Sequence, residues 1–182
     1  MINLPNILSF ARLLSVPIAI MLMLDGRFDI AFWLFVAAGV TDAVDGWIAK
    51  RFDARTEFGA YLDPLADKAL VVSTFVVLGI LGRLPSWLVV LVVFRDVIIV
   101  GGAMVVYAML GDFRSRPSRI SKLNTAFQIA LVALVLARLG LGVGDPRIDL
   151  VLIYLTAATT VASGADYLWQ WGRRLARADD GR

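Results

Sequence analysis

The chain has 182 residues, of which 59% are hydrophobic, and its net charge at pH 7 is only +3. This composition excludes an ordinary soluble domain and predicts an integral membrane bundle. The chain contains neither cysteine nor histidine. That excludes disulfides, thiolate chemistry, Ser-His-Asp triads and histidine-ligated zinc. The expected partner is the lipid bilayer, and no nucleic-acid partner is expected.

Apolar runs predict an all-α membrane protein with six transmembrane helices in one domain, 1–182. Residues 3–11 are mildly amphipathic, so 1–11 is expected to hold a short interfacial helix. The first span ends near residue 24, and its helix is expected to begin within that segment. The other spans are expected at 29–49, 59–81, 86–110, 120–139 and 150–171. Loops are expected at 50–58, 111–119 and 140–149, and a polar tail at 172–182.

The basic residues gather on alternate sides of these spans. The N-terminal region, the loops at 50–58 and 111–122, and the C-terminal region hold most of the lysines and arginines. The intervening loops hold only Arg27, Arg83, Arg138 and Arg147. The positive-inside rule then predicts that both termini are cytoplasmic. The expected location is a bacterial inner membrane, with the ends of the second and third spans that adjoin 50–58 facing the cytoplasm.

Four carboxylates lie at that cytoplasmic end. Asp42 and Asp45 are three residues apart, and Asp63 and Asp67 are four apart, so each pair shares one face of a helix. A charged side chain within a membrane span costs about 2.5–3.5 kcal/mol, and such groups face a bundle interior where they find partners. The nearby cations do not obviously neutralise four acids. One or two hard cations with oxygen ligands would.

The same stretch carries a family signature. It runs D-A-V-D-G-W-I-A-K, eight further residues, then G-A-Y-L-D-P-L-A-D. This resembles the pattern of the CDP-alcohol phosphotransferases, D-x2-D-G-x2-A-R-x8–12-G-x3-D-x3-D. The matching positions are Asp42, Asp45, Gly46, Ala49, Gly59, Asp63 and Asp67. Lys50 stands where the family usually has Arg, which keeps the charge but loses the bidentate fork.

The resemblance implies a metal-dependent enzyme that uses a CDP-lipid. It assigns Mg²⁺ or Mn²⁺, two ions, to Asp42, Asp45, Asp63 and Asp67, and the catalytic base to Asp67. The residues alone do not choose which of the four acids is the base. A homodimer is also implied. The positions expected to contact the CDP-lipid are Gly46, Ala49, Lys50, Gly59 and Asn6. Asn6 belongs to an N-x2-[ST]-x2-R element with Ser9 and Arg12, which interfacial anchoring explains equally well.

Two further strings indicate a branch of the family. L-P-N-I-L-S-x2-R and F-R-D-V-I-I-V-G-G look like the branch that holds phosphatidylglycerophosphate synthases and CMP-forming cardiolipin synthases. Arg95-Asp96 and the S-K-x-N-T string containing Asn124 look more like the cardiolipin synthase type. Glycerol 3-phosphate is close to a dianion and favours two or more cations, whereas phosphatidylglycerol is a singly charged diester. The favoured reaction therefore joins CDP-diacylglycerol to phosphatidylglycerol, with glycerol 3-phosphate as the alternative acceptor.

The expected acceptor contacts are basic or polar side chains of the fourth span, of the loop that follows it and of the start of the fifth span. An ionisable group within a span is a functional candidate by default, and basic side chains suit an acceptor phosphate. The candidates are Arg95, Arg116, Arg119, Lys122 and Asn124. Ordinary positive-inside charge also explains the loop, and a salt bridge that fixes helix packing also explains Arg95.

Two other classes of protein stay open: an ion pathway and a non-catalytic membrane scaffold. An ion pathway would carry its acids along the depth of the bundle. Here the acids gather at one end at metal-ligand spacing, and all four are intact. The pattern therefore favours a phospholipid-synthesising enzyme.

Overall fold

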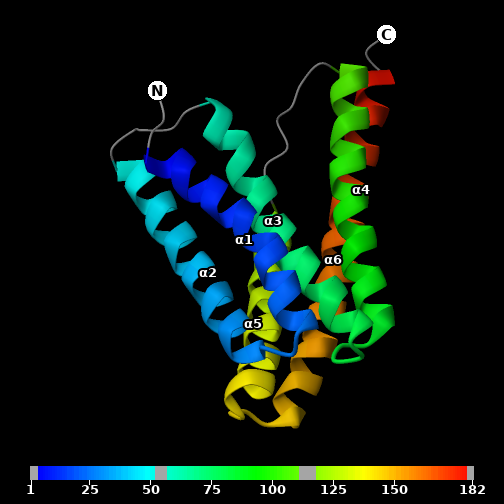
Figure 1. Cartoon of the computed structure of the whole chain (residues 1–182). Coiled ribbons are helices and arrows are strands. Elements are labelled where there is room, and N and C mark those ends of the chain that lie inside the picture. The colour runs from blue at the N-terminus through cyan, green and yellow to red at the C-terminus, as the bar shows by residue number, and fades with distance from the viewer. Residues whose placement is uncertain (1–3, 52–56, 111–117, 180–182) are drawn as a thin grey trace. The chain divides into compact units, whose positions relative to one another are not determined.

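The structure is a computed structural model that describes residues 4–51, 57–110 and 118–179. Those residues form six helices in chain order (Figure 1). They are α1 (Leu4–Leu24), α2 (Phe28–Arg51), α3 (Glu57–Ile80), α4 (Ser86–Leu110), α5 (Arg119–Leu141) and α6 (Pro146–Asp179). The chain divides into two compact units: 1–84 with 132–146, and 85–131 with 147–182. Each unit is described by itself below.

The helix bounds confirm the all-helical prediction and correct it at both ends of the chain. The segment 1–11 holds no separate interfacial helix, because α1 runs without a break from Leu4 to Leu24. No glycine or proline stands between residues 6 and 16 to interrupt it. At the other end, the predicted polar tail at 172–182 begins as helix, since α6 continues to Asp179. Arginine and alanine are strong helix formers and extend the apolar span past its end.

The predicted loop at 140–149 is wrong at both of its ends, and the structure confines it to four residues. Helix α5 runs to Leu141 and α6 begins at Pro146, which suits proline because the first helical N–H has no partner to lose. Gly140 is therefore not a helix breaker. A Cβ atom there would lie 2.3 Å from the backbone nitrogen of Asp29. Glycine lets the end of α5 approach the start of α2 closely.

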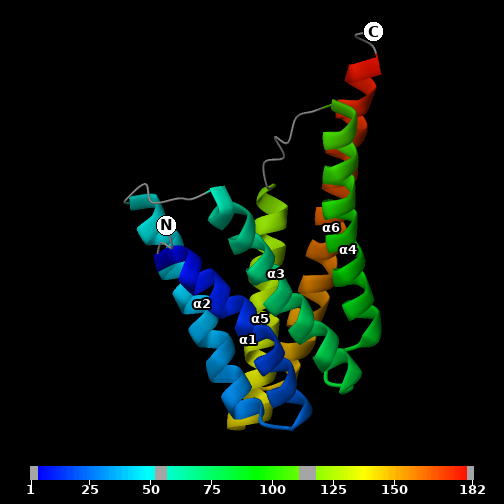
Figure 2. The ribbon, with the colours of Figure 1, turned by 45° about the horizontal axis from the view of Figure 1, so that its top comes forward.

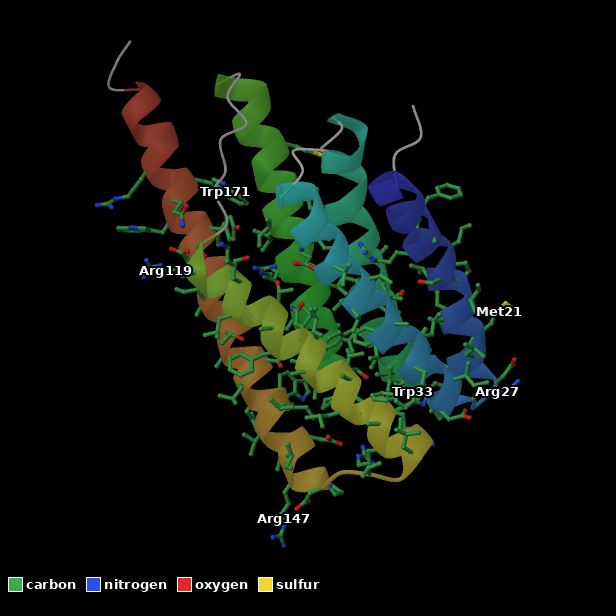
Figure 3. All side chains as sticks on the ribbon, turned by 90° about the vertical axis from the view of Figure 1, so that its left-hand side faces the viewer. Met21, Arg27, Trp33, Arg119, Arg147 and Trp171 are labelled. Carbon is green, nitrogen blue, oxygen red and sulfur yellow. The ribbon has the colours of Figure 1, made fainter. Side chains whose placement is uncertain are left out.

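The first unit is organised around α1, which packs against both α2 and α3 (Figures 1 and 2). Its buried core draws one or two large apolar side chains from each helix: Met23, Phe35, Phe75 and Leu78. The turn that joins α1 to α2 carries exposed Arg27, which Figure 3 labels. Close packing of α1 on two partners is what fixes polar groups of α1 opposite those of α2.

The second unit contains α4, the first half of α5 and α6. Leu88, Val92 and Leu131 are fully buried in it. Trp171 of α6 lies against α4: its ring stands 2.0 Å from where a Cβ would be at Gly102. A larger residue at position 102 would therefore require the Trp171 ring to move. Tyr167 stacks beside Trp171 at 5.6 Å between ring centroids and completes this contact.

Two helices are long and apolar enough to cross a membrane within the described residues, at Arg119–Leu141 and Pro146–Arg173. Exposed aromatic side chains lie along the second of these. The rings of Tyr154 and Trp87 are 6.3 Å apart between centroids, and the Trp169 ring lies 5.1 Å from the guanidinium carbon of Arg173. The fifteen helical residues from Tyr154 to Trp169 rise about 22 Å, which is less than the roughly 30 Å of a hydrocarbon core. These two aromatics therefore do not by themselves flank such a layer.

Candidate functional site

The first unit places one signature carboxylate in an ion pair with a buried arginine. Arg12 of α1 donates from Nη1 to Oδ1 of Asp42 on α2 at 2.9 Å. The Arg12 side chain is 3% exposed and the Asp42 side chain 43%. The arginine is thus held inside the helix packing, while the carboxylate stands at its edge. Arg12 contributes a fixed positive charge that orients Asp42.

The ion pair uses only one of the two oxygens of Asp42. A carboxylate can accept several hydrogen bonds or metal contacts through its two oxygens. Metal-binding carboxylates are commonly held by a second hydrogen-bonding partner. The half-exposed Asp42 has such a partner in Arg12, and its role as a metal ligand stays a prediction.

The remaining signature residues are placed by their helices. Asp45, Gly46, Ala49 and Lys50 follow Asp42 on α2. Gly59, Asp63 and Asp67 lie on α3, and Asn6 lies on α1. The side chains of all eight lie outside the described residues, and their predicted roles stay predictions. Their spacing on continuous helices keeps Asp45 on the face of Asp42 and Asp67 on the face of Asp63.

The second unit places Arg95 in a closed polar cluster. From α4, Arg95 donates through Nη1 to the neighbouring Asp96 at 2.6 Å. Its Nη2 donates to Ser121 on α5 at 2.6 Å and to Ser163 on α6 at 2.5 Å. The ring of Tyr167 lies 5.9 Å from the guanidinium carbon. Arg95 is buried and ties three helices together.

Asn124 lies one turn beyond Ser121 on α5 and is also buried. Its Oδ1 accepts hydrogen bonds from the hydroxyls of Thr159 and Thr160 on α6, at 2.9 and 2.8 Å. The structure thus brings Arg95 and Asn124 into successive turns of one interface. Asn124 sits there among neutral hydroxyls.

The other predicted acceptor residues do not join this interface. Arg119 and Lys122 lie in the first turn of α5 and are exposed, and Figure 3 shows Arg119 directed away from the helices. Arg116 lies outside the described residues. Of the five predicted acceptor contacts, the structure therefore buries two and leaves two at the surface.

The sequence predictions missed the partners of the buried charges. Arg12 was weighed only as part of an N-terminal element, although a charge between apolar residues must find a counter-charge. Ser121 and Ser163 were not singled out as partners of Arg95. The available signal was periodic: polar residues recur at 121, 124 and 128 on α5 and at 156, 160 and 163 on α6. Spacing of three and four residues in an apolar helix marks one polar face.

Fold and site together describe a helical, membrane-type protein in which one signature carboxylate, Asp42, is paired with a buried arginine. Comparison with known proteins agrees. The chain belongs to the CDP-alcohol phosphatidyltransferase family, whose model matches residues 2–162.

Curated relatives fall into two groups. The chain is 36% identical over 180 residues to a fission-yeast protein described as a cardiolipin synthase (CMP-forming) / mitochondrial hydrolase fusion, covering 91% of this chain and 30% of that protein. It is 34% identical to the human cardiolipin synthase (CMP-forming), covering 94% and 62%. It is also 34% identical to the CDP-diacylglycerol–glycerol-3-phosphate 3-phosphatidyltransferase of Bacillus subtilis, covering 92% and 94%. The chain thus spans less than two thirds of these cardiolipin synthases and nearly all of the bacterial protein.

Proposed function

We propose that this protein transfers the phosphatidyl group from CDP-diacylglycerol to a hydroxyl of phosphatidylglycerol, giving cardiolipin and CMP. Family membership supports the phosphatidyl transfer. The choice of acceptor rests on one observation, which is that the side chains around Asn124 carry no net charge. Six membrane-spanning helices, cytoplasmic termini, an active site facing the cytoplasm of a bacterial inner membrane, and a homodimer are parts of the same proposal.

The donor set fits Mg²⁺ or Mn²⁺. Both ions prefer carboxylate oxygens, and the signature supplies Asp42, Asp45, Asp63 and Asp67 on two helices. Asp42 is already oriented by Arg12. A bound ion would neutralise charge on the diphosphate and on departing CMP. Gly46, Ala49 and Gly59 are small, which leaves room for the CDP-lipid beside those helices, with Lys50 and Asn6 as its polar contacts.

The chain's own residues then perform three tasks. The carboxylate face of α2 and α3 positions the diphosphate. Asp67 accepts the proton of the acceptor hydroxyl as its oxygen bonds to the lipid-bearing phosphorus. The bond between that phosphorus and the bridging oxygen of the diphosphate breaks, and the electron pair leaves with CMP. The ion pair with buried Arg12 holds the Asp42 carboxylate in place throughout.

The charge around Asn124 supports phosphatidylglycerol as the acceptor. The buried cluster next to it contains one cation, Arg95, and one anion, Asp96, which bond each other. Asn124 adds hydroxyl partners and no charge. Among the described residues this interface therefore offers no net positive charge to a dianion. The exposed cations at the start of α5, Arg119 and Lys122, with Arg116 preceding them in the chain, suit a phosphate of either charge and do not separate the two acceptors.

Glycerol 3-phosphate is the second candidate acceptor. The match to the Bacillus subtilis enzyme favours it, because that relative is covered over 94% of its length. The Nε atom of Arg95 also has no hydrogen-bond partner among the described residues, and could meet a phosphate oxygen.

The test is CMP release by the purified protein in detergent–lipid micelles with CDP-diacylglycerol and magnesium. One reaction receives phosphatidylglycerol and the other glycerol 3-phosphate. Turnover with phosphatidylglycerol alone is expected. Turnover with glycerol 3-phosphate alone would replace the first candidate by the second. Absence of CMP release in both reactions would overturn both proposed acceptors.

A further inference from the structure

A seam of polar side chains runs between α5 and α6 in the second unit. The two helices are antiparallel there, because higher residues on α5 meet lower residues on α6. Ser121 and Ser163 share the Nη2 group of Arg95. One turn on, Asn124 bonds Thr160. The same register places Gln128 opposite Thr156 in the third layer.

Three atoms of the last two layers are unpartnered. Asn124 Nδ2, Gln128 Nε2 and Thr156 Oγ1 are buried and have no hydrogen-bond partner among the described residues. The exposed fractions are 0%, 3% and 0% for the three residues. Such groups are rarely left unpaired inside a protein, and still less in a span that faces lipid. The seam therefore has hydrogen-bonding capacity that its own side chains do not use.

The chemistry of these atoms specifies the ligand. Two are amide N–H donors, and the third is a hydroxyl that both donates and accepts. Successive layers of a helix pair lie about 6 Å apart, so one small group between two layers can hydrogen-bond side chains of both. A hydroxyl oxygen satisfies all three atoms, since it accepts from both amides and donates to Thr156. An anion would lack that proton.

We infer that Asn124, Gln128 and Thr156 form a binding site for one uncharged hydroxyl oxygen within the α5–α6 seam. Two sources share this chemistry: a buried water and a glycerol hydroxyl of an acceptor. The site itself does not depend on the proposed function, although the second source does. Buried water in proteins makes about three hydrogen bonds, which is the number offered here.

Selective labelling of glutamine gives a direct test, because Gln128 and Gln170 are the only glutamines in the chain. Protein with ¹⁵N in its glutamine side chains is studied by NMR in micelles, without acceptor and then with phosphatidylglycerol or glycerol 3-phosphate. We expect a dipolar cross-peak between water and the Gln128 side-chain amide, with opposite signs in the NOE and ROE spectra. Gln170 donates to Asp166 at 3.0 Å and serves as the internal control.

The acceptor additions distinguish the two sources. A cross-peak that persists unchanged identifies water as the occupant. A cross-peak that is lost while the Gln128 resonance shifts saturably identifies an acceptor hydroxyl. Absence of the cross-peak, with no shift on addition of either acceptor, would overturn the site and indicate that the two amides bond each other. CMP release is measured separately, so failure of the site and failure of the enzymatic proposal remain distinguishable.

A matched pair of variants adds a second check. Thr156→Val removes one of the three oxygen contacts and is expected to weaken the Gln128 cross-peak severalfold. Thr74→Val is the control, because Thr74 is a buried threonine whose hydroxyl already bonds the Leu70 carbonyl at 2.8 Å. An equal Gln128 cross-peak in both variants would show that Thr156 is not part of the site.

Discussion

Each unit of the molecule buries one arginine beside one aspartate, and the two pairs are built differently. Arg12 reaches from α1 to Asp42 on α2, and the aspartate side chain is 43% exposed. Arg95 bonds its own neighbour Asp96, which is 13% exposed, and adds two serines from α5 and α6. The first pair is open on its acidic side. The second is closed around its cation.

The first arrangement orients a carboxylate, whereas the second links neighbouring helices to one another. An open carboxylate held by a buried cation keeps an oxygen for a ligand, as metal sites require. A closed cluster forms its hydrogen bonds with neighbouring helices and so sets the register between them. We therefore assign the chemistry to the first unit, and to the second unit the positioning of the segment from Ser121 to Asn124.

Asp67→Asn acts on the chemistry of the first unit alone. Loss of the proposed base should lower the turnover rate by about 10²- to 10⁴-fold, while CDP-diacylglycerol binding stays measurable. Steady-state CMP release and lipid binding are measured on the same preparation, with Asp166→Asn as a control carboxylate outside the signature. Loss of binding together with turnover would make Asp67 chiefly a metal ligand.

Asp96→Asn and Asp42→Asn compare the two pairs directly. Removing Asp96 leaves the buried charge of Arg95 without its counter-ion, and breaking a buried pair costs about 3–5 kcal/mol of the free energy of unfolding. Removing Asp42 likewise takes the carboxylate away from a buried arginine, Arg12, so a loss of stability is expected there as well. The two variants should differ in activity, because Asp42→Asn should abolish CMP release whereas Asp96→Asn should keep part of it. Denaturant titration and CMP release are measured for both, and full activity of Asp42→Asn would contradict the assignment of chemistry to the first pair.

Arg12→Gln tests whether the open pair orients a metal ligand. Loss of an outer partner of a ligand lowers metal affinity or activity about 10- to 100-fold. The magnesium concentration for half-maximal CMP release should therefore rise by at least about 10-fold. Arg27→Gln, at an exposed arginine in the α1–α2 turn, is the control. An unchanged magnesium requirement would leave Arg12 a packing role only.

Gly102→Ala tests the packing that supports the closed cluster. A Cβ there would meet the Trp171 ring, whereas a Cβ at Gly101 meets nothing within 4 Å. Overpacking costs about 1–3 kcal/mol, and alanine in an open helical position gains up to about 1 kcal/mol over glycine. Thermal unfolding should therefore rank Gly101→Ala above Gly102→Ala. Equal midpoints would mean that Trp171 moves aside freely.

The helices were largely predictable, because long apolar runs leave few alternatives. The fourth span was predicted at 86–110 and is α4 with those bounds. The predicted helix ends are wrong where a glycine or a polar residue is compatible with both a loop and a helix. The sequence predicts a loop at Gly140, but this glycine lies in α5 and allows a close backbone contact. The sequence predicts a polar tail after residue 171, but that stretch continues α6.

The acidic residues of the candidate site could be predicted from the sequence. The residues that pair with them could not. Fixed spacing on a helix places Asp42 and Asp45 on one face without any tertiary information. The pairing of Asp42 with Arg12 depends on how α1 packs, which no local pattern encodes. Arg95 was recognised as a charge within a span, but its two serine partners lie 26 and 68 residues away in the chain. The structure shows how fully its terminal nitrogens are engaged.

The most direct test of the account is to follow the acyl chains of the acceptor. Purified protein receives CDP-diacylglycerol, magnesium, phosphatidylglycerol with deuterated chains, and an equal concentration of glycerol 3-phosphate. Mass spectrometry of the lipids should find cardiolipin carrying the deuterated chains, formed in equal amount with CMP and absent with a chelator or with Asp67→Asn. Phosphatidylglycerophosphate as the only lipid product would contradict the proposed acceptor, and no CMP-coupled product would contradict the enzyme.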